Sequence, residues 1–233
     1  LIQKQEMDFS SLNLKREGSK TKLDWALNQI FGRDHCLNDS EHWFLFAAIS
    51  KAKPESVRIL EIGTADGTTS ALLALLFPDS EIVTIDLPKE DKKFRASYNR
   101  IKTADTYVEK RDKLLKRFSN INFLELNSIR LGEWTDQKFD LIWVDGAHGY
   151  PVLPIDLHNA CRLINDGGYI AVDDVFLELT KSDEMYRSKA AIETLKLFKD
   201  NKIIDDFKLL RKRLGLEFNF KNLNEKFLAI IPF

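Results

Sequence analysis

Cysteine is scarce in this sequence, and its scarcity excludes two classes of protein. Only Cys36 and Cys161 occur among the 233 residues. Two cysteines are too few for a disulfide framework, and their spacing fits no zinc site. This usage is typical of a reducing compartment, so we expect a cytoplasmic protein.

Long hydrophobic runs and an excess of one charge sign are missing too. No apolar stretch approaches the roughly 20 residues that a membrane-spanning helix needs. Lysine and arginine total 35, aspartate and glutamate total 36, and the formal net charge is −1. This balance predicts neither a membrane nor a nucleic-acid partner. Aromatic residues are also sparse among the basic segments, which disfavours stacking on nucleic-acid bases. Whether the chain forms a homo-oligomer stays open.

From residue 57 onward, strand-like and helix-like segments alternate. Short apolar runs predict five strands, at residues 57–63, 81–87, 121–127, 139–145 and 169–175. Helical stripes fall between them, at 70–77, 91–118, 152–164 and around 191–198. The last two apolar segments, 203–210 and 226–233, are expected to form an antiparallel pair. The pattern predicts an α/β fold with a doubly wound, mostly parallel, seven-stranded Rossmann-like sheet.

The residues before the first strand predict a separate helical layer. Residues 1–20 are polar and unpatterned, so we expect a loose arm. A helical stripe follows at 21–31, and a second helix is expected to begin at Asp39 or Ser40. We therefore divide the chain into an N-terminal arm and helical cap, residues 1–52, and a ligand-binding domain, residues 53–233.

A glycine-containing turn, EIGTADGTTS at 61–70, joins the first strand to its helix. Gly63 and Gly67 allow a tight turn and a close approach of the backbone to a ligand. A plain strand–helix turn would use glycine in the same way. The dinucleotide pattern G-x-G-x-x-G is absent, because Ala65 and Thr68 stand at its second and third glycine positions.

Acidic residues around this turn favour a cationic ligand over a phosphate. Asp66 would repel a pyrophosphate, whereas S-adenosylmethionine has no phosphate and carries a sulfonium and an ammonium group. Asp86 ends the second strand, where a carboxylate can accept both ribose hydroxyls. Without the glycine turn, Asp86 would be interpreted as a helix or loop cap.

The E-x-G-x-x-x-G turn followed by Asp86 resembles class I S-adenosylmethionine-dependent methyltransferases. The spacing is most similar to small-molecule O-methyltransferases related to catechol O-methyltransferase, of the type 24-like subgroup. The resemblance implies that Glu61, Gly63, Asp66 and Gly67 line the methionine part of the cofactor. It also implies that Asn127 and Ser128 contact the adenine, and that Asp86 holds the ribose. The full set of cofactor-binding candidates is Glu61, Gly63, Thr64, Ala65, Asp66, Gly67, Ser70, Asp86, Asn127, Ser128 and Asp145.

Three aspartates and a histidine follow the fourth and fifth strands. WVDGAHGY supplies Asp145 and His148, and AVDDV supplies Asp173 and Asp174. Adjacent strand ends lie about 5 Å apart, so the carboxylates are expected to converge. Like charges held that close need a proton or a cation, and Mg²⁺ or Ca²⁺ suits oxygen ligands. Individually, Asp145 and Asp174 are also explained as loop and helix caps, and Asp173 as a residue on the opposite face of the pleat. His148 is also explained as a turn residue that hydrogen-bonds to the backbone.

Residues 139–174 resemble methyltransferases that carry an Asp-Gly-x-His-x-Tyr turn, several of which act on hydroxyl groups of sugars or other natural products. The resemblance implies that Asp145, Asp173 and Asp174 are metal ligands. The catechol relatives have Asp-Asn at the last pair, whereas this chain has Asp-Asp.

These observations predict metal-assisted O-methylation of a small-molecule acceptor. His148 or Asp145 would take the acceptor's proton, and His148 is preferred because a histidine pKa is about 6.5. Three alternatives stay open: a hydroxylase-like enzyme on the same scaffold, a nicotinamide oxidoreductase, and a non-catalytic cofactor-binding partner. The hydroxylase-like enzyme would bind the same cofactor without transferring its methyl group. Ala65 and Asp66 disfavour the oxidoreductase. The acidic cluster argues against the non-catalytic partner, because a protein that only binds the cofactor does not need a metal.

Two basic segments, 89–100 and 208–213, have more than one interpretation. A solvated helix face is the common explanation for such charges. The more specific hypothesis is that these segments form a lid over the substrate or a binding site for an anionic acceptor.

Overall fold

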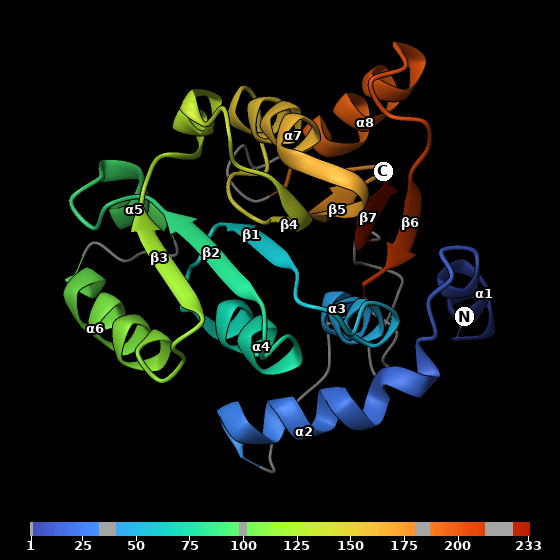
Figure 1. The fold of residues 1–233 in the computed structure, drawn as a ribbon. Helices are drawn as coiled ribbons and strands as arrows, with labels where there is room; N and C mark the ends of the chain where they lie inside the picture. The colour runs from blue at the N-terminus through green and yellow to red at the C-terminus, as the bar shows by residue number, and fades with distance from the viewer. Residues whose placement is uncertain (1, 33–40, 98–101, 180–186, 213–225) are drawn as a thin grey trace.

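The computed structural model confirms a seven-stranded sheet in a Rossmann-like fold (Figure 1), and describes residues 2–32, 41–97, 102–179, 187–212 and 226–233. The strand order is β3-β2-β1-β4-β5-β7-β6. Strands β1 to β5 are parallel, and β7 pairs antiparallel with both β5 and β6. The strands are β1 Arg58–Ile62, β2 Glu81–Asp86, β3 Ile121–Glu125, β4 Phe139–Val144, β5 Ile164–Phe176, β6 Lys208–Arg211 and β7 Lys226–Pro232.

Helices cover both faces of this sheet (Figure 1). On one side lie α2 (Lys20–Phe31), α3 (Glu41–Ala52), α4 (Thr68–Leu76) and α6 (Ala104–Leu115). On the other side lie α7 (Val152–Leu163), α8 (Ala190–Asp200) and the 3₁₀ helix η3 (Ser128–Glu133). The short helix α5 (Lys92–Ala96) follows β2 and stands beyond the strand tips. All of the described helices are too short or too polar to cross a lipid bilayer.

Alternation along the central strands explains why the sheet needs helices on both faces. On β4, Leu141 and Trp143 belong to the hydrophobic cluster under α2, α3 and α4. Ile142 and Val144 point the other way, into the cluster under α7 and α8. Successive side chains of a strand face opposite sides, so a continuous apolar run buries both faces of a parallel sheet.

The prediction of a loose N-terminal arm is wrong. Residues Ile2–Ser10 form helix α1, and Glu17–Ser19 form the 3₁₀ helix η1. Phe9 is fully buried in the same hydrophobic cluster as β1 and β4. The side chain of Gln5 also donates to the carbonyl oxygen of Arg211 at 3.1 Å, on the edge strand β6. Tertiary contacts therefore order a segment whose sequence has no clear helical stripe.

Several predicted boundaries also shift. The predicted helix 91–118 is two helices, α5 and α6. Helix α7 ends at Leu163, and β5 begins at Ile164, so the Asp166-Gly167-Gly168 stop lies inside a strand that was predicted to begin at 169. The pairing of β4 with β5 shifts register there, which accommodates the glycines. The predicted strand 203–210 is reduced to β6, and the predicted helix start at Asp39 or Ser40 lies outside the described residues.

Candidate functional site

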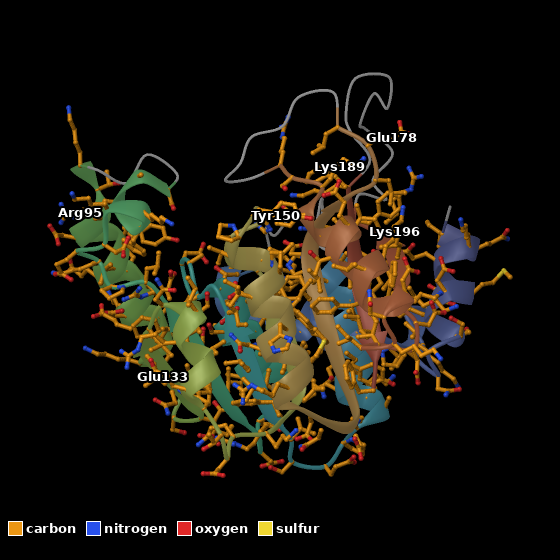
Figure 2. The ribbon with its side chains drawn as sticks, turned by 90° about the horizontal axis from the view of Figure 1, so that it is seen from above. Arg95, Glu133, Tyr150, Glu178, Lys189 and Lys196 are labelled. Carbon is orange, nitrogen blue, oxygen red and sulfur yellow. The ribbon has the colours of Figure 1, made fainter. Side chains whose placement is uncertain are left out.

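A cavity of about 210 Å³ opens at the carboxyl ends of β1, β2 and β4. This edge is where open α/β sheets bind ligands, beside the point at which the strand order reverses. The order reverses between β1 and β4, which are neighbours in the sheet. Figure 2 shows Arg95, Tyr150 and Glu178, which follow β2, β4 and β5, at this end of the molecule.

The glycine turn forms one wall of the cavity through its backbone. Gly63 has φ +100°, and its amide donates to the carbonyl oxygen of Ile85 at 2.9 Å, which ties the turn to β2. Gly67 has φ +80° and directly precedes α4. Ala65 also has a positive φ, 49°, in a region that alanine rarely adopts. The two glycines therefore occupy the positions at which the turn needs their conformational freedom.

Asp86 connects this turn to the end of β2. Its carboxylate accepts the amide of Ala65 at 2.9 Å and the amide of Leu87 at 2.7 Å. These bonds fix the carboxylate at the cavity wall, where Asp86 is one of the lining residues. Asp86 therefore caps the turn, as one interpretation of the sequence predicts. Its carboxylate also lies at the position expected to hold a ribose.

The structure divides the predicted cofactor-binding residues into two groups. Six line the cavity: Gly63, Ala65, Asp86, Asn127, Ser128 and Asp145. Five do not line it, although they build the turn or lie behind it: Glu61, Thr64, Asp66, Gly67 and Ser70. Asp66 is exposed, and its carboxylate accepts the amide of Thr68 at 2.9 Å. Asn127 likewise accepts the amide of Ile129 at 3.1 Å and caps η3.

Glu61 is a buried acid beneath the turn. Its side chain is fully buried, and the hydroxyls of Ser70 and Thr84 both donate to its Oε2 atom. Its Oε1 atom has no hydrogen-bond partner among the described residues. Burial raises the pKa of Glu61 to about 8, against the opposing hydrogen bonds from Ser70 and Thr84. Near neutral pH the folded protein therefore keeps this carboxyl protonated.

Replacing Glu61 with Gln is expected to remove a pH-dependent loss of stability. The pKa of Glu61 is raised by folding, so its stabilising contribution is complete below pH 4.5 and is lost as the pH rises to about 8. Across that window the wild type should lose on the order of 4 kcal/mol relative to the variant, because Gln does not ionise. Urea unfolding at a series of pH values measures the difference. Glu109→Gln, at an exposed position of α6, is the control, and equal slopes in all three proteins would contradict the prediction.

Sequence reasoning missed most of the apolar residues that line the cavity. Helix α5 contributes Lys93 and Phe94, and Phe94 is almost fully buried. Asp91 begins this helix by accepting the amide of Lys93 at 2.7 Å. Within its described part, the basic segment 89–100 therefore contributes to the cavity wall. The other missed lining residues are Ile62, Ile85, Leu87, Ser97, Leu126, Ile129, Gly146, Ala147 and Val152.

The predicted proton acceptors, Asp145 and His148, both line the cavity. His148 is 5% exposed, and its Nε2 atom lies 3.8 Å from Asp145 Oδ1 and 3.9 Å from Asp174 Oδ2. Burial lowers the pKa of His148 below its usual value of 6.5, although Asp174 and Asp173 oppose the shift. Burial and the nearby Asp173 raise the pKa of Asp145 well above its usual range. A neutral imidazole thus stands at the cavity wall near neutral pH.

The three aspartates converge, and two lysines lie among them. Lys212 Nζ is 2.8 Å from Asp173 and 3.1 Å from Asp174, and Lys226 Nζ is 2.7 Å from Asp174. Asp174 has φ +53°, and the pairing of β5 with β7 shifts register between Val172 and Val175. This irregularity brings both carboxylates to one ammonium group, despite the alternation expected of a regular strand. Lys212 and Lys226 outweigh the effect of burial and hold the pKa of Asp173 below its usual range.

This arrangement does not fit the predicted divalent cation. A magnesium ion needs oxygen ligands at about 2.1 Å, but the ammonium groups already contact the oxygens of Asp173 and Asp174. Across the described ranges, no group of three or more acidic, histidine or cysteine side chains has a metal-binding arrangement. The structure therefore does not support the metal role predicted for Asp145, Asp173 and Asp174.

The doubly wound sheet, with a glycine turn and a carboxylate facing one cavity, defines a Rossmann-like nucleoside-binding fold. Residues 60–175, half of the chain, match the family described as a methyltransferase domain. This region runs from β1 to the end of β5 and so includes the glycine turn, Asp86 and the aspartate cluster. The chain belongs to this methyltransferase family.

Solved methyltransferase structures share the fold at low sequence identity. A candidate O-methyltransferase from Klebsiella pneumoniae aligns over 91% of this chain and 89% of its own, with a TM-score of 0.54 and 18% identity. Fibrillarin from Aeropyrum pernix, solved with bound S-adenosyl-L-methionine, aligns over 76% and 66%, with a TM-score of 0.50 and 18% identity. The N-methyltransferase NodS from Bradyrhizobium japonicum aligns over 82% and 94%, with a TM-score of 0.50 and 16% identity. Among curated proteins, none matches the chain in sequence.

Proposed function

We propose that this protein is an S-adenosylmethionine-dependent methyltransferase that methylates a hydroxyl group of a small molecule. The observation that carries the proposal is the cavity itself, in which the Gly63 turn and Asp86 face Asp145 and His148. The first pair suits a nucleoside, and the second pair suits proton removal. The cytoplasmic location and a possible homo-oligomer remain predictions.

The residues around the cavity have distinct proposed roles. Asp86 accepts the ribose hydroxyls, Asn127 and Ser128 contact the adenine, and the backbone at Gly63 and Ala65 borders the methionine part. When bound, the cofactor supplies an electrophilic methyl group on a positively charged sulfur. His148 accepts the proton that the acceptor hydroxyl loses as its oxygen bonds to that methyl group.

His148 is the observation that favours oxygen as the acceptor atom. A hydroxyl is a weak nucleophile until a base takes its proton, and a neutral imidazole at the cavity wall is such a base. Asp145 is a poorer candidate, because burial and the nearby Asp173 raise its pKa and so favour the protonated form, which cannot accept a proton. Its proposed role is to hold the imidazole from 3.8 Å away.

Calorimetry tests the cofactor assignment. Wild-type protein is expected to bind S-adenosylmethionine and not NAD, and Asp86→Ala is expected to weaken binding about 30-fold, because a charged hydrogen-bonding group is lost. Asp105→Ala is the control, since Asp105 lies on the exposed face of α6 and pairs only with exposed Lys89 in the described contacts. Preferential binding of NAD, or equal affinity in both variants, would overturn the assignment.

Release of S-adenosylhomocysteine tests the activity. A panel of sugar, phenol and other hydroxyl compounds is expected to contain acceptors that release it, whereas matched amines should not. Cofactor binding without release from any compound would favour a non-catalytic partner, and hydroxylated products would favour a hydroxylase-like enzyme.

A further inference from the structure

The lysines of the aspartate cluster come from the hairpin formed by β6 and β7. Lys212 directly follows β6, and Lys226 opens β7. The two residues are joined by a hydrogen bond from the Lys212 amide to the Lys226 carbonyl oxygen, at 2.9 Å. Because β7 runs antiparallel to β5, Lys226 pairs with Phe176, next to the end of β5 that carries Asp173 and Asp174. The fold thus delivers both ammonium groups to the cluster.

Lys212 is buried and Lys226 is half-buried, so neither side chain extends into open solvent. The side chain of Lys212 is 4% exposed and that of Lys226 is 16% exposed. A buried ammonium group is stable only when it is paired, and the carboxylates of Asp173 and Asp174 are its partners here. This position also corrects the interpretation of 208–213, in which Lys212 belonged to a solvated basic face or an anion site.

Charge in the cluster is nearly balanced without any ion. Three aspartates carry at most three negative charges, and the two lysines supply two positive ones. A divalent cation placed among these groups would be repelled by two ammonium groups within a few ångströms.

We propose that Lys212 and Lys226 are built-in counter-ions that take the place of a divalent cation in this site. They are positioning residues: they hold Asp173 and Asp174, and Asp174 in turn lies beside His148. The proposed methyl transfer then proceeds without a metal. Only this consequence for methyl transfer rests on the proposed function.

Cation binding by the apoprotein tests the proposal independently of turnover. Mn²⁺ titration followed by electron paramagnetic resonance is expected to show no site in the wild type. Thermal unfolding should shift by less than about 1 °C in millimolar Mg²⁺ or Ca²⁺. A Mn²⁺ site that disappears in Asp173→Asn would overturn the proposal, whether or not any lysine variant folds.

If the lysines replace a cation, removing one lysine charge should make the protein respond to added divalent cations. Lys212→Met keeps the stem and removes the charge, so it should melt lower than the wild type and regain about 5 °C or more in millimolar Mg²⁺ or Ca²⁺. Lys212→Arg retains the charge and should gain no response to the cations. Lys208→Met is the matched control, because Lys208 begins β6, the strand that Lys212 follows, and its side chain is only half-buried. A Lys212→Met protein that folds and ignores both cations would contradict the proposal.

Turnover separates this inference from the proposed function. If an acceptor is methylated, a chelator should leave the rate within about 2-fold of its original value, and a larger loss would overturn metal independence alone. If nothing is methylated, the cation-binding results still decide the role of the lysines.

Discussion

Replacing Gly63 with Ala is expected to destabilise the fold by about 4 kcal/mol or more and to abolish cofactor binding. Gly63 has φ +100°, and a Cβ atom there would lie 2.2 Å from the carbonyl oxygen of Asp145. That oxygen belongs to the backbone, so it cannot rotate away as a flexible side chain would. The amide of Asp145 also donates to Ile62 at 2.9 Å, which fixes the distance between β1 and β4. Urea unfolding and calorimetry with S-adenosylmethionine measure the two effects.

Gly167→Ala is the matched control for this prediction. Gly167 also has a positive φ, +74°, but nothing lies within 4 Å of its missing Cβ atom. Its replacement should therefore cost only the backbone term, about 1–2 kcal/mol, and leave cofactor binding intact. Equal losses in the two variants would mean that strain, and not the contact with Asp145, explains the need for glycine at Gly63.

Replacing His148 with Ala is expected to lower kcat by about 100-fold or more while cofactor affinity stays within about 2-fold. The imidazole lines the cavity beside Asp145 and Asp174, yet none of the groups expected to hold the nucleoside depends on it. His158→Ala, on the exposed side of α7, is the control. Steady-state kinetics with an acceptor found in the hydroxyl panel separates the effect on kcat from the effect on cofactor binding.

The pH profile supplies a second test of His148. Because its pKa lies below 6.5, the base is neutral at pH 7, and the wild-type rate should stay level from about pH 7 to 9 and fall at acidic pH. The acidic fall should disappear in His148→Ala. An unchanged profile in that variant would assign proton removal to another group, with Asp145 as the nearest candidate.

The sequence predicted the central sheet well because the local hydrophobic pattern there agrees with the structure that each segment adopts. β1, β2 and β4 are short apolar runs bounded by turns, and most residues of each strand are buried on both faces of the sheet. The glycine turn, Asp86 and the Asp145–His148 pair were predicted because parallel strands end at one edge, which brings residues after each strand together. Helix α1 could not be predicted in this way, because Phe9 and Gln5 gain their partners only from distant strands.

Within the site, sequence established which residues follow each strand but not which of them face the cavity. Glu61 sits on the strand leading into the turn, and the pleat directs it inward to Ser70 and Thr84 instead of toward a ligand. Phe94 lies at the charged beginning of the predicted helix 91–118, which the structure divides into α5 and α6. Its place in the cavity wall therefore depends on how α5 packs beyond β2.

By itself the sequence determined the doubly wound scaffold, the glycine turn and the gathering of acids at one edge, since these follow from local patterns and strand order. Only the tertiary structure decided which groups neutralise the negative charge of those acids. Lys212 and Lys226 are 39 and 52 residues beyond Asp173 and Asp174 respectively, and antiparallel pairing of β7 with β5 brings them into contact. No local pattern encodes that contact, because it depends on the direction and register of a strand pair.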